Sequence, residues 1–187
     1  TVPGTPSAWA ELSRRFGKLD FASLLAPAIR LAHEGFPVSP VIASLWQRDE
    51  ATFRRHLEGE ATQAWFETFT PAGRAPRAGE WYRCTDQAAT LERIAETGAE
   101  SFYRGELAER IDAFSRRTGG YLRAEDLADY RPEWVAPISA RYRDVDVWEI
   151  PPNGQGLVAL MALRMLEGFE PGHRDAPEVL HRQLEAM

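Results

Sequence analysis

Residues 105–132 read GELAERIDAFSRRTGGYLRAEDLADYRP, and this stretch decides the expected fold class. Its first half belongs to a row of apolar residues that begins at Phe102 and repeats at helical spacing. This row predicts one helix that ends at Gly119-Gly120. Glycine suits such an end because it adopts a left-handed backbone without steric cost. The row consists of Phe102, Leu107, Ile111 and Phe114.

A second, shorter helix is expected near Ala124 to Tyr130. Glu125 and Asp126 fall in its first turn, where acidic side chains interact favourably with the helix dipole, typically by roughly 0.3–1 kcal/mol each. Arg123 precedes this helix at a position where the family resemblance described below implies a serine or threonine cap, so the start of the helix is expected to be weaker here.

Toward the N-terminus, four further helices are expected, each introduced by a cap residue or a first-turn proline. Gly35 and Gly98 are expected to end two of them. The region from Glu58 to Gly79 is less regular, with turns at its glycines and prolines and a short extended piece around Trp65 to Phe69. The four helices begin at Thr5-Pro6, Asp20, Ser39-Pro40 and Thr85-Asp86.

Toward the C-terminus, one strand is expected within Tyr142–Ile150, where valines alternate with acidic residues. Asp144 and Asp146 would share one exposed face of it. Leu157 to Leu166 is apolar on nearly every side, which predicts a helix buried all round in a complete enzyme. A last helix is expected from Asp175 to the end of the chain. The expected class is therefore α+β, mainly helical.

Composition excludes some classes of protein. The net charge is −6 with arginines spread among acids, so no basic face favours nucleic acid. No apolar stretch of about 18 residues is present, so no membrane-spanning helix is expected. Cys84 is the single cysteine, and the compartment therefore stays open between periplasm, cytoplasm and secretion. At 187 residues, a single domain spanning 1–187 is the simplest expectation.

Short motifs along the whole chain resemble the large chain of γ-glutamyltranspeptidases. The resemblance rests first on the stretch quoted above and on the loop Pro151-Pro152-Asn153-Gly154-Gln155-Gly156. Motifs in the family's order precede them, including Val2-Pro3-Gly4, Phe16-Gly17-Lys18-Leu19, Leu25-Ala26-Pro27-Ala28-Ile29, Gly35-Phe36-Pro37-Val38-Ser39, Thr90-Leu91, Ile94-Ala95 and Phe102-Tyr103.

The resemblance implies an internal segment of the large chain of an N-terminal-nucleophile hydrolase of αββα architecture, truncated at both ends. Such an enzyme cleaves γ-glutamyl amides such as glutathione through a threonine acyl-enzyme and passes the γ-glutamyl group to water or an amino acid. The family's Thr-Thr-His nucleophile sequence is absent here. No catalytic residue is therefore assigned, no cofactor is expected, and the implied partners are the small-chain remainder of the precursor and a small γ-glutamyl substrate.

Three alternatives to this interpretation stay open. Related enzymes act as acylases on cephalosporin side chains or on poly-γ-glutamate. A different class would be a catalytically silent helical module whose apolar face meets another chain. Such a face would also let the isolated chain self-associate.

The strongest candidate site is the loop with Asn153, Gly154, Gln155 and Gly156, expected to bind substrate. Its glycines would let the backbone approach a ligand and present N–H donors at the start of a helix, which suits a carboxylate. The competing interpretation is a tight strand-to-helix turn that needs glycine for its angles alone.

Other candidates are weaker. Thr1 could attack an amide with its own amine as base, but Pro3 follows too closely for the strand that such a nucleophile normally begins. The acid pairs Glu125/Asp126 and Asp144/Asp146 are more typical of a helix start and a wet strand face. His173 and His181 lack a further ligand at zinc spacing.

Overall fold

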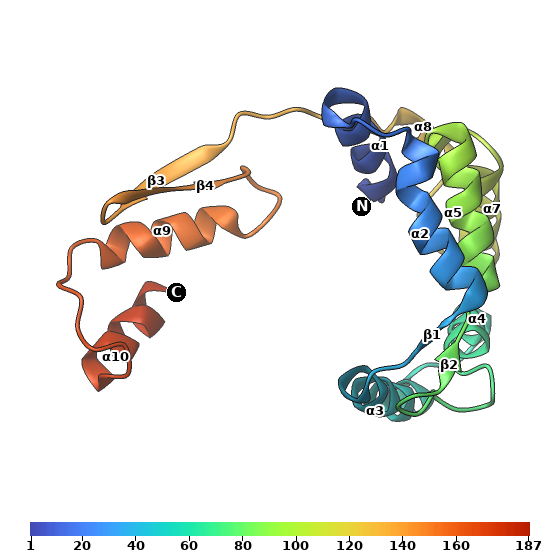
Figure 1. Cartoon of the computed structure of the whole chain (residues 1–187), viewed down its shortest axis with the longest axis horizontal. Helices are drawn as coiled ribbons and strands as arrows, with labels where there is room; N and C mark the ends of the chain where they lie inside the picture. Colours follow the sequence, from blue (N-terminus) through green and yellow to red (C-terminus); the bar gives the residue numbers. More distant parts are fainter. The chain divides into compact units, whose positions relative to one another are not determined.

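The computed structural model describes residues 1–187, and it confirms a mainly helical α+β chain (Figure 1). Residues Thr1–Pro132 form one compact unit and Glu133–Met187 a second. The first contains α1 Thr5–Phe16, α2 Phe21–Glu34, β1 Phe36–Pro37, α3 Pro40–His56, α4 Glu60–Phe69, β2 Trp81–Tyr82, α5 Thr85–Thr97, α6 Glu100–Arg104, α7 Glu106–Arg117 and α8 Ala124–Asp129. The second contains β3 Ile138–Tyr142, β4 Val145–Glu149, α9 Gly156–Leu166 and α10 Pro177–Ala186.

The division into two units differs from the single unit expected from the sequence. The boundary lies in the stretch from Pro132 to Pro137, which has no regular structure. Two prolines disfavour helix there, because each lacks an N–H and restricts the residue before it. That both units belong to one domain of a longer chain stays a prediction.

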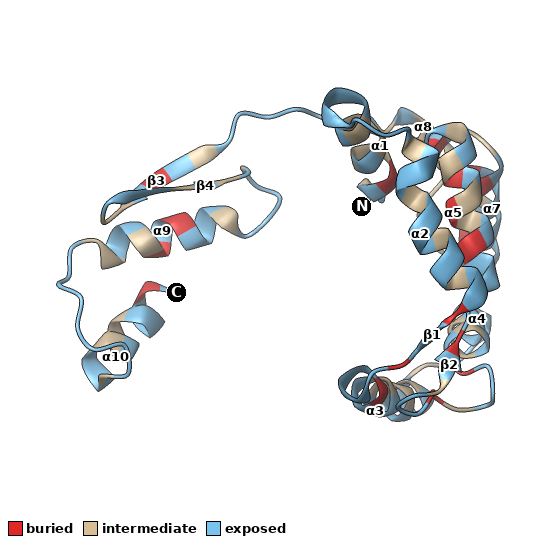
Figure 2. Cartoon of the chain, viewed as in Figure 1, coloured by how far each residue is buried: buried red, intermediate tan, exposed pale blue.

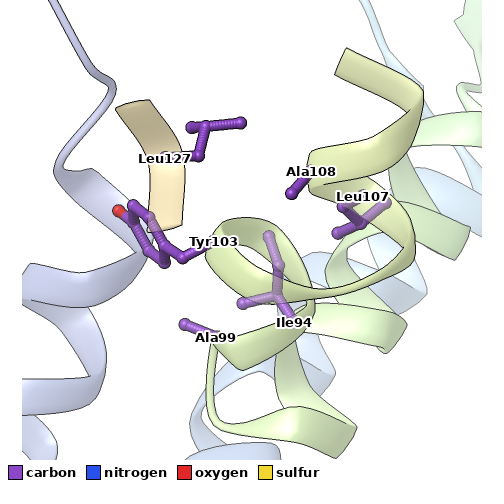
Figure 3. Close-up of a cluster of buried hydrophobic side chains, with 6 residues drawn as sticks. All are labelled: Ile94, Ala99, Tyr103, Leu107, Ala108 and Leu127. Atoms are coloured by element: carbon purple, nitrogen blue, oxygen red, sulfur yellow. The ribbon is translucent and has the colours of Figure 1, made fainter. Parts of the chain in front are cut away.

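The core of the first unit lies where α5, α6, α7 and α8 meet (Figure 3). Leu127 of α8 is completely buried there. The Tyr103 hydroxyl donates to the Pro3 carbonyl (2.8 Å) and accepts from the Ser7 N–H (3.2 Å), which ties the start of α1 to this core. The buried cluster consists of Ile94, Ala99, Tyr103, Leu107, Ala108 and Leu127.

The helix expected from Phe102 to Gly119 is interrupted at Gly105, which is extended (φ −147°, ψ −153°) between α6 and α7. A β-carbon on Gly105 would lie 3.0 Å from the Ser101 Cα, so the chain turns there at a close contact that favours glycine. The break lets Tyr103 and Leu107 face the same core from two helices.

Most predicted helix ends of the first unit are confirmed. The Asp20 carboxylate accepts from the Ser23 N–H at 3.0 Å, and the Ser39 hydroxyl from the Ile42 N–H at 3.4 Å. Gly98 ends α5 in the left-handed conformation, with φ 58°. The predicted Thr5 cap is wrong: Gly4 occupies the N-cap position and Thr5 is the first residue of α1.

The extended piece expected around Trp65 to Phe69 is also wrong, because these residues lie in α4. Their aromatic rings pack on α3, with Trp65 4.7 Å from Phe53 and Phe69 5.9 Å from Trp46 between ring centroids. This tertiary packing outweighs the weaker local preference for strand.

The second unit is a β-hairpin with two helices (Figure 1). The predicted strand is confirmed as β4, but Tyr142 belongs to β3, which pairs antiparallel with β4 from Tyr142↔Val145 to Ile138↔Glu149. Arg143 (φ 57°) and Asp144 form the turn. Asp144 therefore does not share a strand face with Asp146, contrary to expectation.

Helix α9 packs on the hairpin through part of its apolar surface only (Figure 2). Leu160 and Ala162 are buried, whereas Val158, Met161 and Met165 are about half exposed. Its burial on all sides in a complete enzyme stays a prediction. None of the helices combines the length and the apolar character that crossing a membrane requires.

Candidate functional site

The candidate loop connects β4 to α9 and begins at Pro151-Pro152. Asn153, Gly154 and Gln155 are exposed, and Gly156 is partly buried as the first residue of α9. The structure thus brings the four predicted residues together at one helix N-terminus.

The N-terminus of α9 carries no cap from a side chain and no acid in its first turn. The Gln155 carbonyl accepts from the N–H groups of Val158 (3.0 Å) and Ala159 (3.3 Å), as a cap residue does. The N–H groups that precede these two have no carbonyl one turn earlier to bind. Because they lie at the positive end of the helix dipole, a carboxylate is the group this arrangement suits.

The two glycines of the loop have different surroundings. A β-carbon on Gly156 would lie 2.6 Å from Glu149 Oε2 and 2.7 Å from Glu149 Cβ, whereas one on Gly154 would meet nothing within 4 Å. Neither glycine has a positive φ. Close packing against Glu149 therefore explains Gly156 structurally, and no steric requirement explains Gly154.

We expect Gly156→Ala to destabilise the second unit by about 1–3 kcal/mol, because the added methyl group overlaps with Glu149 next to the backbone. Gly154→Ala is the matched control and should change stability by less than about 0.5 kcal/mol. Urea unfolding of the two variants measures the difference. Equal effects of the two substitutions would contradict the packing account.

The acidic pairs considered from the sequence have structural partners. Asp126 Oδ2 accepts from the Arg123 N–H at 2.8 Å, a bond from the third residue of α8 back to its N-cap residue, and Asp146 pairs with Arg141 at 3.1 Å. One acid of each pair therefore has a local partner of its own, and the structure does not join either pair into a catalytic dyad.

The histidines and Cys84 also form no centre. His173 and His181 are exposed, no group of three or more His, Cys, Asp or Glu side chains is placed to hold a metal, and Cys84 packs beside Val38, Ala43 and Tyr82. Thr1 is exposed in a segment without regular structure ahead of α1.

Sequence reasoning missed an ion-pair network around the loop before β2. The Glu80 carboxylate binds the Arg74 guanidinium (2.8 Å) and the Arg77 N–H (2.8 Å), which lowers the pKa of Glu80 to about 2. Glu50 accepts from the Ala75 N–H at 2.6 Å. A carboxyl group with so low a pKa stays ionised near neutral pH and is unsuited to act as a general acid.

Burial raises the pKa of Tyr103 and of Tyr82. Both phenols are therefore protonated near neutral pH and serve as hydrogen-bond donors to backbone carbonyls: Tyr103 to Pro3 and Tyr82 to Thr68.

Comparison with solved structures defines the class. The chain matches a cephalosporin acylase from Bacillus halodurans with a TM-score of 0.95 and 55% identity, covering 100% of this chain and 35% of that one. It matches Helicobacter pylori gamma-glutamyltranspeptidase with a TM-score of 0.86 and 26% identity, over 99% of this chain and 52% of that one. The fold is that of a large-chain segment of an N-terminal-nucleophile hydrolase.

The chain belongs to the gamma-glutamyltranspeptidase family, whose model matches residues 1–187. Among curated relatives it is 36% identical to a glutathione hydrolase-like proenzyme of Bacillus subtilis, over 91% of this chain, and 35% identical to an oxamate amidohydrolase proenzyme of Klebsiella pneumoniae, over 100% of this chain. It spans about a third of the length of these relatives, 31% and 35% respectively.

Proposed function

We propose that the complete protein hydrolyses γ-glutamyl amides such as glutathione and transfers the γ-glutamyl group to water or to an amino acid. The observation that carries this proposal is the family match along the whole chain, together with relatives named glutathione hydrolases in bacteria and fungi. Apart from the loop at residues 151–156, the helical unit and the hairpin unit would then be scaffold of the large chain.

The chemistry of this proposal needs a nucleophile from outside residues 1–187. A threonine hydroxyl attacks the amide carbonyl, its own α-amine accepts the proton and returns it to the leaving amine, and an acyl-enzyme remains. Water or an amino acid then takes the acyl group and restores the hydroxyl. The small-chain remainder of a self-cleaving precursor would supply this threonine, in keeping with the proenzyme names of the relatives.

The proposed contribution of this chain to substrate binding is the loop with Asn153, Gly154, Gln155 and Gly156. The N–H groups at the uncapped start of α9 suit a substrate carboxylate, and the exposed Asn153 and Gln155 amides can add hydrogen bonds.

A second candidate function is an acylase that removes a different acyl group. It is favoured by the 55% identity to the cephalosporin acylase, compared with 26% to the Helicobacter pylori enzyme. Both candidates share the threonine mechanism and differ in the acyl group that the substrate site accepts.

Steady-state kinetics of the complete protein separates these candidates. We expect a higher kcat/KM on γ-glutamyl-p-nitroanilide than on glutaryl-p-nitroanilide, which lacks only the α-amino group. A preference for the glutaryl substrate would favour the second candidate function over the first.

For the loop, we expect Asn153→Ala to raise the KM of the complete protein for its substrate severalfold. Asp144→Ala, in the exposed hairpin turn, is the matched control.

We also propose that the isolated chain self-associates through the exposed apolar side of α9, where Met161 is 55% exposed. Sedimentation velocity of the 187-residue chain should show species larger than a monomer, and Met161→Asp should reduce them. A monodisperse monomer at all protein concentrations would rule this out.

A further inference from the structure

The first unit has a groove of about 570 Å³ along α7, which is separate from the candidate loop at residues 151–156. One continuous side of α7 forms its length, because the lining residues of this helix are three or four positions apart. Phe102 of α6 and Leu122 add further apolar wall. The lining consists of Thr90, Phe102, Leu107, Arg110, Ile111, Phe114, Ser115, Thr118, Gly120 and Leu122.

The groove is apolar and partly open. Leu107 is buried at the core, whereas Phe114 is 37% exposed and Phe102, Ile111 and Leu122 are partly buried. A volume of this size falls in the range that holds a small organic molecule. The walls therefore suit a flexible hydrocarbon chain or a ring.

Arg110 is the only charged residue in the lining, and no acidic residue lies there. The two neighbouring arginines of α7 are paired, Arg116 with Asp112 (2.9 Å) and Arg117 with Glu60 (2.5 Å), but Arg110 makes no hydrogen bond or ion pair. Its guanidinium thus has all of its donors open to a ligand.

The other polar side chains of the groove cannot bind an anion in the same way, because their hydroxyl groups already make hydrogen bonds within the protein. The Thr90 and Thr118 hydroxyls donate within their helices, to the carbonyls of Asp86 and Phe114. The Ser115 oxygen accepts from the Arg123 guanidinium at 3.2 Å. Recognition of charge in this groove therefore depends on Arg110 alone.

A second cavity in this unit, of about 360 Å³, gives the contrast. Its Arg104 and Arg131 guanidiniums donate to the Ala128 and Tyr130 carbonyls, and Glu11 and Glu100 add negative charge to its lining. The α7 groove, in contrast, combines apolar walls with a single unpaired arginine.

We propose that the α7 groove binds an apolar monocarboxylate, an aliphatic or aromatic acid whose carboxylate pairs with Arg110 while its hydrocarbon part lies between Phe102, Ile111 and Phe114. The site uses no residue of the 151–156 loop and does not rest on the proposed acyl transfer. A carboxylate and a guanidinium form two parallel hydrogen bonds, which accounts for the choice of anion.

Isothermal titration of the 187-residue chain with decanoate tests this proposal. Decanoate should bind with a Kd below about 1 mM. Octanoate should bind more weakly, by about fourfold for each methylene group that is lost from contact. Decanol, which keeps the chain but lacks the charge, should bind about tenfold more weakly than decanoate.

Two variants locate the site. Arg110→Gln should weaken decanoate about tenfold and leave decanol unchanged, whereas Phe114→Ala should weaken both ligands. Arg30→Gln is the matched control, since Arg30 is an exposed arginine of α2 that lines neither cavity described in the first unit, and it should change neither affinity. Circular dichroism of each variant confirms that the helices remain.

The proposal is overturned if decanoate does not bind, if decanol binds as tightly as decanoate, or if Arg30→Gln weakens decanoate as much as Arg110→Gln does. None of these results bears on acyl transfer by the complete protein, because that assay uses a different substrate and different residues.

Discussion

The isolated chain is expected to leave γ-glutamyl-p-nitroanilide uncleaved and untransferred, with turnover on the order of a millionfold below that of the complete protein. Acyl transfer needs a nucleophile, a base within hydrogen-bond reach and donors for the oxyanion. The family's Thr-Thr-His sequence is absent from residues 1–187, and Thr1 lies in an exposed segment without regular structure.

A sensitive anilide assay on the purified chain beside its Thr1→Ala variant measures this. Both proteins should give the same background rate. Turnover that vanished with Thr1→Ala would identify Thr1 as a nucleophile and contradict the assignment of this chain as scaffold.

Leu127→Ala is expected to lower the free energy of unfolding of the first unit by about 2–5 kcal/mol, the largest stability effect we foresee for a single substitution. Leu127 is 0% exposed and contacts the cluster that holds α5, α6, α7 and α8 together (Figure 3). Truncation removes its apolar contacts and leaves a cavity that rigid helices fill only in part.

Leu184→Ala is the matched control, because Leu184 is 75% exposed at the end of α10. Its substitution should change stability by less than about 0.5 kcal/mol. Urea unfolding followed by circular dichroism gives both values. Similar losses for the two leucines would mean that the cluster around Tyr103 is not the core that stabilises the first unit.

Most helices could be predicted because their ends carry local chemical signals. Asp20, Ser39 and Gly98 act through atoms a few residues away, so the sequence alone contains the interaction. The α4 helix and the two-residue strands β1 and β2 could not be predicted in this way. They depend on long-range contacts, such as Trp65 with Phe53 and Phe36 with Tyr82.

In the candidate site, too, the local features could be predicted from the sequence and the long-range contacts could not. The strand, the turn and the helix around Gly156 follow from local pattern, but its close contact with Glu149 depends on how β4 returns to α9. The network of Glu50, Arg74 and Glu80 was missed because Glu50 meets Ala75 across 25 positions of sequence. The unpaired state of Arg110 likewise appears only once its neighbours are placed.

Covalent trapping tests the central claim, that this chain is scaffold of an acyl-transfer enzyme whose nucleophile lies elsewhere in the complete protein. The complete protein is mixed with a γ-glutamyl substrate, quenched in acid and digested, and the acylated peptide is found by mass spectrometry. We predict a γ-glutamyl ester on a threonine outside residues 1–187. An acyl group on any residue within 1–187 would contradict the account.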